Sequence, residues 1–267
     1  MRIDGCNALI TGASAGIGRE FAQQLGGRAT TLVLVARRRV RLEELRSELL
    51  GRHPDLRVEI KLADLSQHEA VDELIVWAAM QKPAIDLLIN NAGLGDIGAF
   101  ATAEPERVNQ MVQVNMVALT RLTRGLLPRM IEQKSGAILN VSSSAGFLPL
   151  ANFAIYAATK AYVTSFSEAL RSELCGSGVS VTALCPGPVR TEFTDVARRK
   201  SQGESEAAPE MTYVPVEEVV AAALHGMERN RPIVIPGWVM RVGMALVRLT
   251  PMSFLRLTSR FSAKRTR

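Results

Sequence analysis

Short apolar runs alternate with longer amphipathic stretches along most of the chain, and this alternation restricts the possible folds more than any other feature. The apolar runs predict strands at residues 7–11, 31–36, 57–62, 86–90, 137–142, 180–185 and 232–235. The amphipathic stretches predict helices at residues 16–25, 40–50, 67–80, 105–133, 153–175 and 215–229. Most of the strands are apolar throughout, as parallel strands covered on both faces are. The pattern predicts an α/β fold: a doubly wound parallel sheet of about seven strands with helices on both faces.

Length and composition favour a single folded domain. With 267 residues, of which 47% are hydrophobic and 22% charged, the chain can bury one large core. We expect this domain over residues 1–237 and an extension over residues 238–267. The chain has no run of about 18 uncharged apolar residues, and it enters its first strand without the apolar segment of a signal peptide. We therefore expect a cytoplasmic protein, with a peripheral position on a membrane as the alternative.

The cysteines, the histidines and the charge distribution exclude several classes of function. Neither the three cysteines nor the three histidines are spaced as metal ligands, so we expect no metal site and no disulfide framework. The net charge of +6 is unevenly distributed. Nine lysines and arginines and no acidic residue lie between Arg229 and Arg267, which leaves the rest of the chain at −3. A nucleic-acid-binding domain would carry its basic face on the folded body, so we expect no nucleic-acid partner.

A glycine-rich turn connects the first predicted strand to the first predicted helix. Its residues include Gly12, Ser14, Gly16, Ile17 and Gly18. Glycine permits a tight turn and a close approach of the backbone to a pyrophosphate, and a helix N-terminus offers free N–H groups with a partial positive charge. The spacing, Gly-x-x-x-Gly-x-Gly, differs from the general Rossmann signature, but strand and helix flank it in the required order. We expect a Rossmann-like nucleotide site rather than the flexible turn that a lone glycine motif often forms.

Basic residues at the end of the second predicted strand indicate which dinucleotide binds. An acidic residue at the strand end would accept a hydrogen bond from the 2′-hydroxyl of NAD(H), whereas a guanidinium suits the 2′-phosphate of NADP(H). Arg37 and Arg38 stand there. We therefore expect NADP(H), with NAD(H) as the less favoured alternative. Further contacts, to the adenine amino group and the adenosine ribose, are expected from Asp64 and from Asn91, Ala92 and Gly93.

Tyr156 and Lys160 lie four residues apart on a predicted helix, so their side chains share one face. A nearby ammonium stabilises a phenolate, and we expect it to lower the tyrosine pKa from about 10 toward neutral pH, as a general acid for carbonyl reduction requires. Ser143, at the end of the fifth predicted strand, could donate a hydrogen bond to the substrate carbonyl. Many such helical pairs are merely solvated, so this pair gains its meaning from Ser143 and the glycine turn.

Taken together, these motifs resemble the classical short-chain dehydrogenase/reductase family. The match extends from about residue 6 to residue 196 and includes the turn at 11–18, the Asn-Asn-Ala-Gly segment at 90–93, Ser143, Tyr156 and Lys160. Asn115 matches the family's catalytic asparagine. The segment that contacts the nicotinamide is matched by Pro186, Gly187, Val189 and Thr191. The resemblance implies an oxidoreductase that prefers NADP(H) and transfers a hydride between the cofactor and a carbonyl or secondary alcohol.

The resemblance also implies a role for each catalytic residue. Tyr156 would give its proton to the carbonyl oxygen during reduction, and Ser143 would hold that oxygen. Lys160 would lower the tyrosine pKa and bind the nicotinamide ribose, so it would serve both catalysis and cofactor binding. Asn115, at an irregularity in its helix, would hold a water that links Lys160 to solvent. Thr159 stands where the family often has serine.

The residues expected around the substrate are mostly apolar: Leu94, Phe147, Phe153 and Phe193. No arginine or lysine is obviously placed to bind a carboxylate, so we expect a hydrophobic ketone, aldehyde or secondary alcohol. Residues 191–214 resemble the family's mobile substrate lid. Residues 140–191 are loosely similar to 3-oxoacyl and hydroxysteroid reductases, which leaves the substrate open.

The C-terminal extension combines apolar and basic residues. Between residues 238 and 261, Val, Met, Leu and Phe are interleaved with Arg241, Arg248, Arg256 and Arg260. A basic amphipathic helix of this kind, interrupted at Pro251, could lie on an anionic membrane surface. The preferred alternative is a helix that packs over the domain, or forms a subunit interface, with its arginines in water.

The sequence leaves two further alternatives. The chain could bind a dinucleotide as a redox sensor or scaffold without catalysis, although proteins of that kind usually lose the tyrosine or the lysine. The predicted helices at 105–133 and 153–175 could form the seam of a homodimer or homotetramer, and the sequence does not choose between these assemblies.

Overall fold

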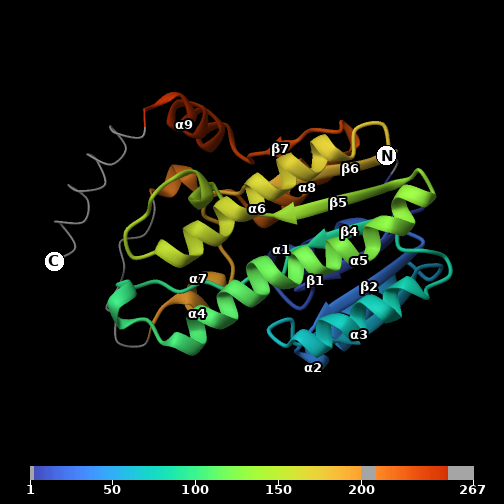
Figure 1. Ribbon diagram of the computed structural model, residues 1–267. Helices are drawn as coiled ribbons and strands as arrows, with labels where there is room; N and C mark the ends of the chain where they lie inside the picture. The colour runs from blue at the N-terminus through green and yellow to red at the C-terminus, as the bar shows by residue number, and fades with distance from the viewer. Residues whose placement is uncertain (1–2, 200–208, 252–267) are drawn as a thin grey trace.

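The computed structural model describes residues 3–199 and 209–251. Within these residues, seven strands form one parallel sheet in the order β3-β2-β1-β4-β5-β6-β7. The strands are β1 (Asn7–Thr11), β2 (Thr31–Ala36), β3 (Arg57–Leu62), β4 (Leu87–Asn90), β5 (Gly136–Val141), β6 (Val179–Leu184) and β7 (Ile233–Val234). The doubly wound α/β fold expected from the sequence is confirmed (Figure 1).

Helices cover both faces of this sheet. They are α1 (Gly16–Leu25), α2 (Arg39–Arg52), α3 (His68–Ala79), α4 (Pro105–Val112), α5 (Leu119–Glu132), α6 (Ala154–Glu173) and α8 (Val216–Glu228). Two further helices, α7 (Phe193–Ala197) and α9 (Trp238–Leu249), follow β6 and β7. The predicted ends of the strands and of most helices agree with the structure to within about two residues, because hydrophobic periodicity follows the buried faces closely.

Alternate side chains of the central strands enter two different apolar cores. Leu32 and Leu34 pack with Phe21 in the core that lies under α1, α2 and α8. Val33 and Val35 pack in the opposite core, with side chains of α3, α5 and α6. In Figure 1 the helices α3, α5 and α6 lie in front of the sheet. Both faces of each central strand are therefore buried, which explains why these strands are apolar throughout.

The helix predicted at residues 105–133 is present but is not regular. Its middle part, η2 (Gln113–Ala118), is a π-helix that joins α4 to α5. Single π turns within α-helices are frequent at functional sites. The irregularity expected at Asn115 is thus confirmed, and Asn115 is buried within it.

The strand order reverses between β1 and β4. The chain first adds β2 and β3 on one side of β1, and then returns to add β4 to β7 on the other side. Doubly wound sheets bind ligands at the carboxyl ends of their strands at such a reversal, because the connecting loops diverge there and leave a crevice. The glycine turn after β1, residues 91–93 after β4 and Ser143 after β5 all lie at this edge.

The helix α9 packs beside this edge. It contacts two short 3₁₀ turns, η3 (Ser144–Phe147) and η4 (Glu210–Thr212). The helix predicted at 238–261 is present over 238–249 and ends before Pro251, whereas residues 252–261 and the polar loop residues 200–208 lie outside the described residues. In the part of the chain that the structure describes, no helix combines the length and apolar character needed to cross a membrane.

Candidate functional site

The glycine turn after β1 packs so tightly against residues 91–92 that side chains would not fit. A Cβ atom on Gly12 would lie 2.8 Å from Asn91 Nδ2, and one on Gly18 would lie 2.4 Å from the same atom. Gly12 and Gly16 also have positive φ angles of 69° and 51°, a region that side chains rarely adopt. The helix α1 begins at Gly16 without a side-chain cap. Its first N–H groups are therefore left for a ligand, and the turn suits a pyrophosphate.

Thr11, the last residue of β1, ties the glycine turn to the end of β4. Its hydroxyl accepts hydrogen bonds from the backbone N–H groups of Asn91 and Ala92, both at 3.0 Å, and donates to the carbonyl of Ile89. The Asn91 side chain donates in turn to the carbonyl of Thr11 at 2.9 Å. Sequence reasoning missed this role of Thr11. A hydroxyl residue at the end of the first strand was the only available signal.

Arg37 and Arg38 diverge at the end of β2. Arg37 extends toward Asp64, with 3.7 Å between its guanidinium and the carboxylate, and both side chains are exposed. Burial raises the pKa of Asp64, but hydrogen bonds from the Ser66 N–H and hydroxyl, together with the charge of Arg37, outweigh it and hold the pKa below its ordinary value. Arg38 instead donates two hydrogen bonds to the Ser14 hydroxyl, at 3.0 and 3.2 Å. Of the two arginines, Arg38 is the one joined directly to the glycine turn.

Glu192 places a carboxylate at this basic corner, which the sequence did not predict. One of its oxygens accepts from Arg38 at 2.5 Å and the other from Arg41 at 2.6 Å. Hydrogen bonds from these two arginines lower the pKa of Glu192, so it is ionised at neutral pH. Arg41 is therefore also part of this cluster. The beginning of the predicted lid is therefore attached to the arginines beside Ser14.

The proline-glycine segment after β6 lies across the same edge of the sheet. A Cβ atom on Gly16 would lie 3.2 Å from Thr191, so these two residues are close neighbours. The carbonyl of Pro186 accepts from the backbone N–H of Ser144 at 2.9 Å. A Cβ atom on Gly187 would lie 2.8 Å from Met240 of α9. Two other predicted cofactor residues are partly buried against the core under α1, α2 and α8: Ile17 and Val189.

The structure brings Ser143, Tyr156 and Lys160 together beneath the end of β5. Tyr156 and Lys160 of α6 are 9% and 4% exposed. The hydroxyl groups of Tyr156 and Ser143 are hydrogen-bonded to each other. The Lys160 ammonium donates to the carbonyl of Val141 at 2.8 Å and lies 5.7 Å from the centre of the Tyr156 ring. A phenol, a hydroxyl and an ammonium are therefore gathered in one buried group.

Burial shifts the pKa of both α6 residues, and for Tyr156 the direction is opposite to the sequence prediction. Loss of solvent raises the pKa of Tyr156 to about 12, and the hydrogen bond from Ser143 only partly opposes this. Loss of solvent also lowers the pKa of Lys160 to about 8, so above that pH the lysine loses its charge. The prediction considered the ammonium and not the burial of the phenol, which outweighs it here. Tyr156 is thus a protonated phenol at neutral pH.

Asn115 contacts this group through the neighbouring turns. Its side-chain amide donates to the carbonyl of Leu94 at 2.9 Å and to the Thr159 hydroxyl at 3.0 Å, and its oxygen accepts from the N–H of Leu94. A Cβ atom on Gly93 would lie 3.4 Å from both Asn115 Oδ1 and Lys160 Nζ. Asn115 therefore joins the β4 end to α6. The hydrogen bond from Asn115 is accepted by the hydroxyl of Thr159, a conservative replacement for the serine that the family often has.

Three of the four predicted substrate residues surround Tyr156. The rings of Phe153 and Phe193 lie 5.8 and 5.4 Å from its ring, centre to centre. Leu94 packs in the same small apolar cluster. The structure does not bring Phe147 to this cluster, since its ring lies under the Arg248 guanidinium of α9 and lines a separate cavity of about 540 Å³ between α6 and α9. The 3₁₀ turn after Ser143 directs Phe147 away from Tyr156.

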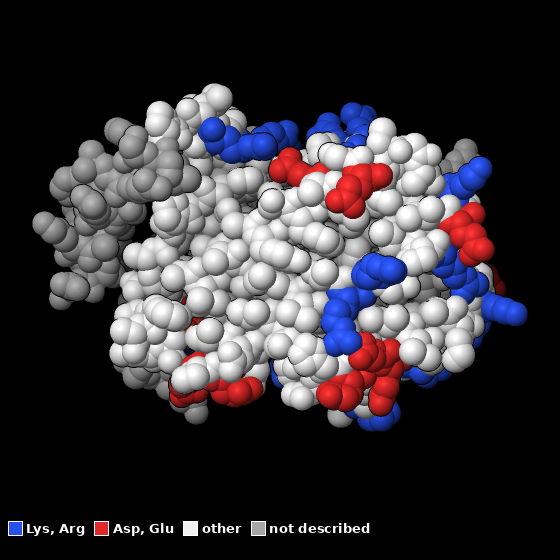
Figure 2. Space-filling model, in the orientation of Figure 1, with Lys and Arg blue, Asp and Glu red and all other residues white. Residues whose placement is uncertain are grey.

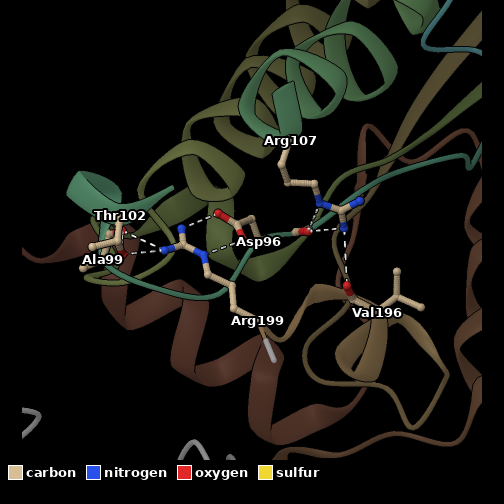
Figure 3. Close-up of polar contacts among 7 residues, drawn as sticks. Asp96, Ala99, Thr102, Arg107, Val196 and Arg199 are labelled. Atoms are coloured by element: carbon tan, nitrogen blue, oxygen red, sulfur yellow. Dashed lines mark hydrogen bonds and ion pairs between the residues drawn. The ribbon is translucent and has the colours of Figure 1, made fainter. Parts of the chain in front are cut away.

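The position of Phe193 is maintained by a clamp at the other end of α7. Arg199 donates two hydrogen bonds to the Asp96 carboxylate, at 2.9 and 2.5 Å, and two more to the Ala99 carbonyl and the Thr102 hydroxyl. Figure 3 shows Arg199 between these groups. The Arg199 and Asp96 side chains are only 15% and 10% exposed, so this is the most buried of the ion pairs found among the described residues.

Further contacts join α7 to the loop after β4. Arg107 of α4 donates to the carbonyl of Gly95 at 2.6 Å and reaches the carbonyl of Val196 at 3.4 Å (Figure 3). The backbone N–H of Ile97 donates to the carbonyl of Ala197 at 2.9 Å. Sequence reasoning did not identify this clamp, because its partners lie about a hundred residues apart and share no recognisable motif.

The family assignment follows from comparison with known proteins. The model of the short chain dehydrogenase family matches residues 6–202. This is most of the chain, and it includes the glycine turn, the β4 end and the buried group around Tyr156. The chain belongs to the short chain dehydrogenase family, a class of oxidoreductases that act on alcohol and carbonyl groups.

Relatives and solved structures agree with this assignment. Sulfoacetaldehyde reductase of Chromohalobacter salexigens is 38% identical over 205 residues, which are 74% of this chain and 78% of the relative. A short-chain dehydrogenase from Sphingobium yanoikuyae in complex with NADPH superimposes with a TM-score of 0.78 at 35% identity, covering 86% and 87% of the two chains. The bulky-bulky ketone specific alcohol dehydrogenase from Comamonas testosteroni gives a TM-score of 0.78 at 34% identity, covering 93% and 94%.

The clamp predicts a local change in stability. Arg199→Met leaves the mostly buried Asp96 carboxylate without its cation. This should cost about 2 kcal/mol, a value between those of exposed and fully buried ion pairs. The hydrogen bond from Ile97 to Ala197 should then open more often, and exchange of the Ile97 amide hydrogen should accelerate about thirtyfold. Hydrogen exchange followed by mass spectrometry measures this change.

Arg190→Met is the matched control for the clamp. It removes an ion pair to Glu210 in which the side chains are 71% and 81% exposed, so exchange at Ile97 should stay unchanged. Equal acceleration in the two variants would contradict a specific role of Arg199.

Proposed function

We propose that the protein interconverts an apolar carbonyl compound and its alcohol, with NADP(H) as the hydride donor or acceptor. The observation that carries this proposal is the protonated Tyr156 phenol, hydrogen-bonded to Ser143 and walled by two aromatic rings. Family membership supports the reaction class. A substrate carbonyl beside the phenol could receive a proton there, because a buried phenol has no competing contact with bulk water.

The glycine turn and the arginines beside it fit NADP(H). Gly12 and Gly18 let the turn pack directly against Asn91, and Gly16 lies against Thr191, so the turn keeps the tight backbone path that a pyrophosphate site requires. Ser14 and Arg38 form a hydroxyl and guanidinium pair that suits a 2′-phosphate. The related Sphingobium structure, which contains NADPH, agrees with this preference. Asp64 and the segment 91–93 would contact the adenosine, and Thr191 the nicotinamide side.

The buried residues divide the chemistry among them. The bound cofactor supplies or accepts the hydride. Tyr156 donates its proton to the carbonyl oxygen in reduction and accepts it back in oxidation, while the Ser143 hydroxyl holds that oxygen. Lys160 binds the nicotinamide ribose and, when charged, stabilises the phenolate that forms. Asn115 joins the end of β4 to Thr159 of α6. Because Lys160 is the next residue of α6, this contact keeps Lys160 in position.

The aromatic walls around Tyr156 favour an apolar substrate. Leu94, Phe153 and Phe193 enclose the Tyr156 side chain. Two arginines beside the lid are occupied, Arg199 by Asp96 and Arg107 by backbone carbonyls. A carboxylate or sulfonate substrate would therefore find neither of them free. These apolar walls fit the kind of substrate for which the related Comamonas enzyme is named, bulky ketones, better than a sulfonated substrate such as that of the sulfoacetaldehyde reductase.

A panel of carbonyl compounds tests the proposed function. NADPH oxidation should be observed with apolar ketones or aldehydes and should be weak with carboxylated or sulfonated ones. Binding of NADPH without turnover across the panel would instead favour the alternative of a dinucleotide-binding sensor or scaffold.

Tyr156→Phe should lower kcat about a thousandfold, because it removes the proton donor while keeping the ring. The dissociation constant for NADPH, measured by fluorescence titration, should change little. Tyr162→Phe is the matched control, since Tyr162 lies on the same helix and its hydroxyl bonds to Thr120 at 2.8 Å, away from Ser143. A Tyr156→Phe enzyme as active as the Tyr162→Phe enzyme would exclude the proposed mechanism.

Glu192→Gln should strengthen the binding of NADPH. The ionised carboxylate engages Arg38 and Arg41 at the corner proposed for the 2′-phosphate, so it competes with that phosphate. Its removal should lower the dissociation constant for NADPH about fivefold and leave that for NADH unchanged. Glu210→Gln, on the exposed pair with Arg190, is the control and should alter neither constant. An equal change for the two cofactors would show that Glu192 does not compete with the 2′-phosphate.

A further inference from the structure

The helix α9 has one face that packs on the protein and a second apolar face that does not. Met244 is buried, and Met240 lies against Gly187. On the outer side, apolar residues recur at intervals of three or four positions and so form one stripe along the helix. The stripe consists of Trp238, Val242, Leu246 and Leu249, which are 76%, 53%, 61% and 82% exposed.

This stripe is unusual among the described residues. They expose twelve large apolar side chains, and four of these lie on α9 while the others are scattered singly or in pairs. Isolated exposed apolar residues need no explanation, but a contiguous row that ends in a tryptophan marks a contact surface. The row is about 18 Å long, given the rise of an α-helix.

The charged residues of the helix itself have one sign. Arg241 and Arg248 are exposed and lie along one edge of the stripe, and the helix contains no acidic residue. Arg229 and Arg231 precede the helix, and five more lysines and arginines follow it in the sequence without any acidic residue. Figure 2 shows basic side chains at the α9 end of the molecule. An apolar row bordered by arginines complements an anionic lipid surface, where arginines reach phosphate groups and tryptophan lies at the headgroup level.

We propose that α9 binds the surface of an anionic membrane, with the stripe in the boundary between headgroups and acyl chains. The helix lies in the plane of the surface, because its inner face is fixed to the protein and its length is insufficient to span a bilayer. Arg241 and Arg248 contact lipid phosphates.

This position has a consequence for the substrate, which rests on the proposed function. The inner face of α9 touches Gly187 and the turn after Ser143. Binding through the outer face therefore brings the edge of the sheet that bears Ser143 close to the lipid. An apolar carbonyl substrate dissolved in the membrane could then reach the aromatic walls around Tyr156 without crossing much water.

Sedimentation with lipid vesicles tests the surface directly. The full chain is mixed with vesicles of phosphatidylcholine alone and of phosphatidylcholine with phosphatidylserine. Binding to the anionic vesicles should exceed binding to the neutral ones and should weaken as salt is added, since exposed charges are screened. Trp238→Ser with Leu246→Ser should lower binding about tenfold or more, as should Arg241→Gln with Arg248→Gln.

Val40→Ser with Val76→Ser is the matched control, because these side chains are 66% and 59% exposed on other helices, and it should bind like the unchanged chain. NADPH binding by all variants confirms that they are folded. Vesicle binding does not depend on turnover, so this test of the membrane surface is independent of the test of the proposed function. No binding to anionic vesicles, or equal binding to both kinds, would overturn the proposal. The proposal would also be overturned if the stripe joined two copies of the chain. In that case the unchanged chain would be a dimer, and Trp238→Ser with Leu246→Ser would dissociate it.

Discussion

The pairing of β1 with β4 is the contact on which the arrangement of the site depends. It reverses the strand order and so opens the crevice at the edge of the sheet. Thr11 strengthens it at the point where the two strands end, by joining the glycine turn to residues 91 and 92. Because Gly12 and Gly18 carry no side chains, the two loops approach closely and still leave the N-terminus of α1 for a phosphate.

Burial then determines the chemistry at the neighbouring strand. β5 and α6 enclose Ser143, Tyr156 and Lys160, and the loss of solvent disfavours both the phenolate and the ammonium. The free protein therefore holds a neutral acid beside a lysine whose charge is easily lost. We propose that charge supplied on cofactor binding, rather than the resting structure, lowers the tyrosine pKa. Arg199 and Asp96 hold one end of α7, and Phe193 at its other end packs against the Tyr156 ring.

The sequence predicted those parts that depend on local patterns. Periodicity located the strands and helices. The glycine turn, Tyr156 and Lys160 were found by their spacing, and Asn115 by its match to the family. It could not predict contacts made by single residues far apart in the chain, such as Asp96 with Arg199 or Glu192 with Arg38. It also gave the wrong direction for the pKa of Tyr156, because burial is a property of the packed structure. Phe147 was misplaced for a similar reason, since a short 3₁₀ turn redirects it toward α9.

The most direct test of this mechanism is the ionisation of Tyr156 with and without NADP⁺. The difference between the ultraviolet absorption spectra of the unchanged protein and the Tyr156→Phe variant isolates the signal of this phenol from that of the other tyrosines. Free protein should show no phenolate from Tyr156 up to about pH 10, because burial raises the pKa to about 12. Addition of NADP⁺ near pH 8 should produce phenolate, as the positive nicotinamide and Lys160 lower that pKa. A phenolate already present in the free protein, or no change on adding NADP⁺, would contradict the proposed roles of Tyr156 and Lys160.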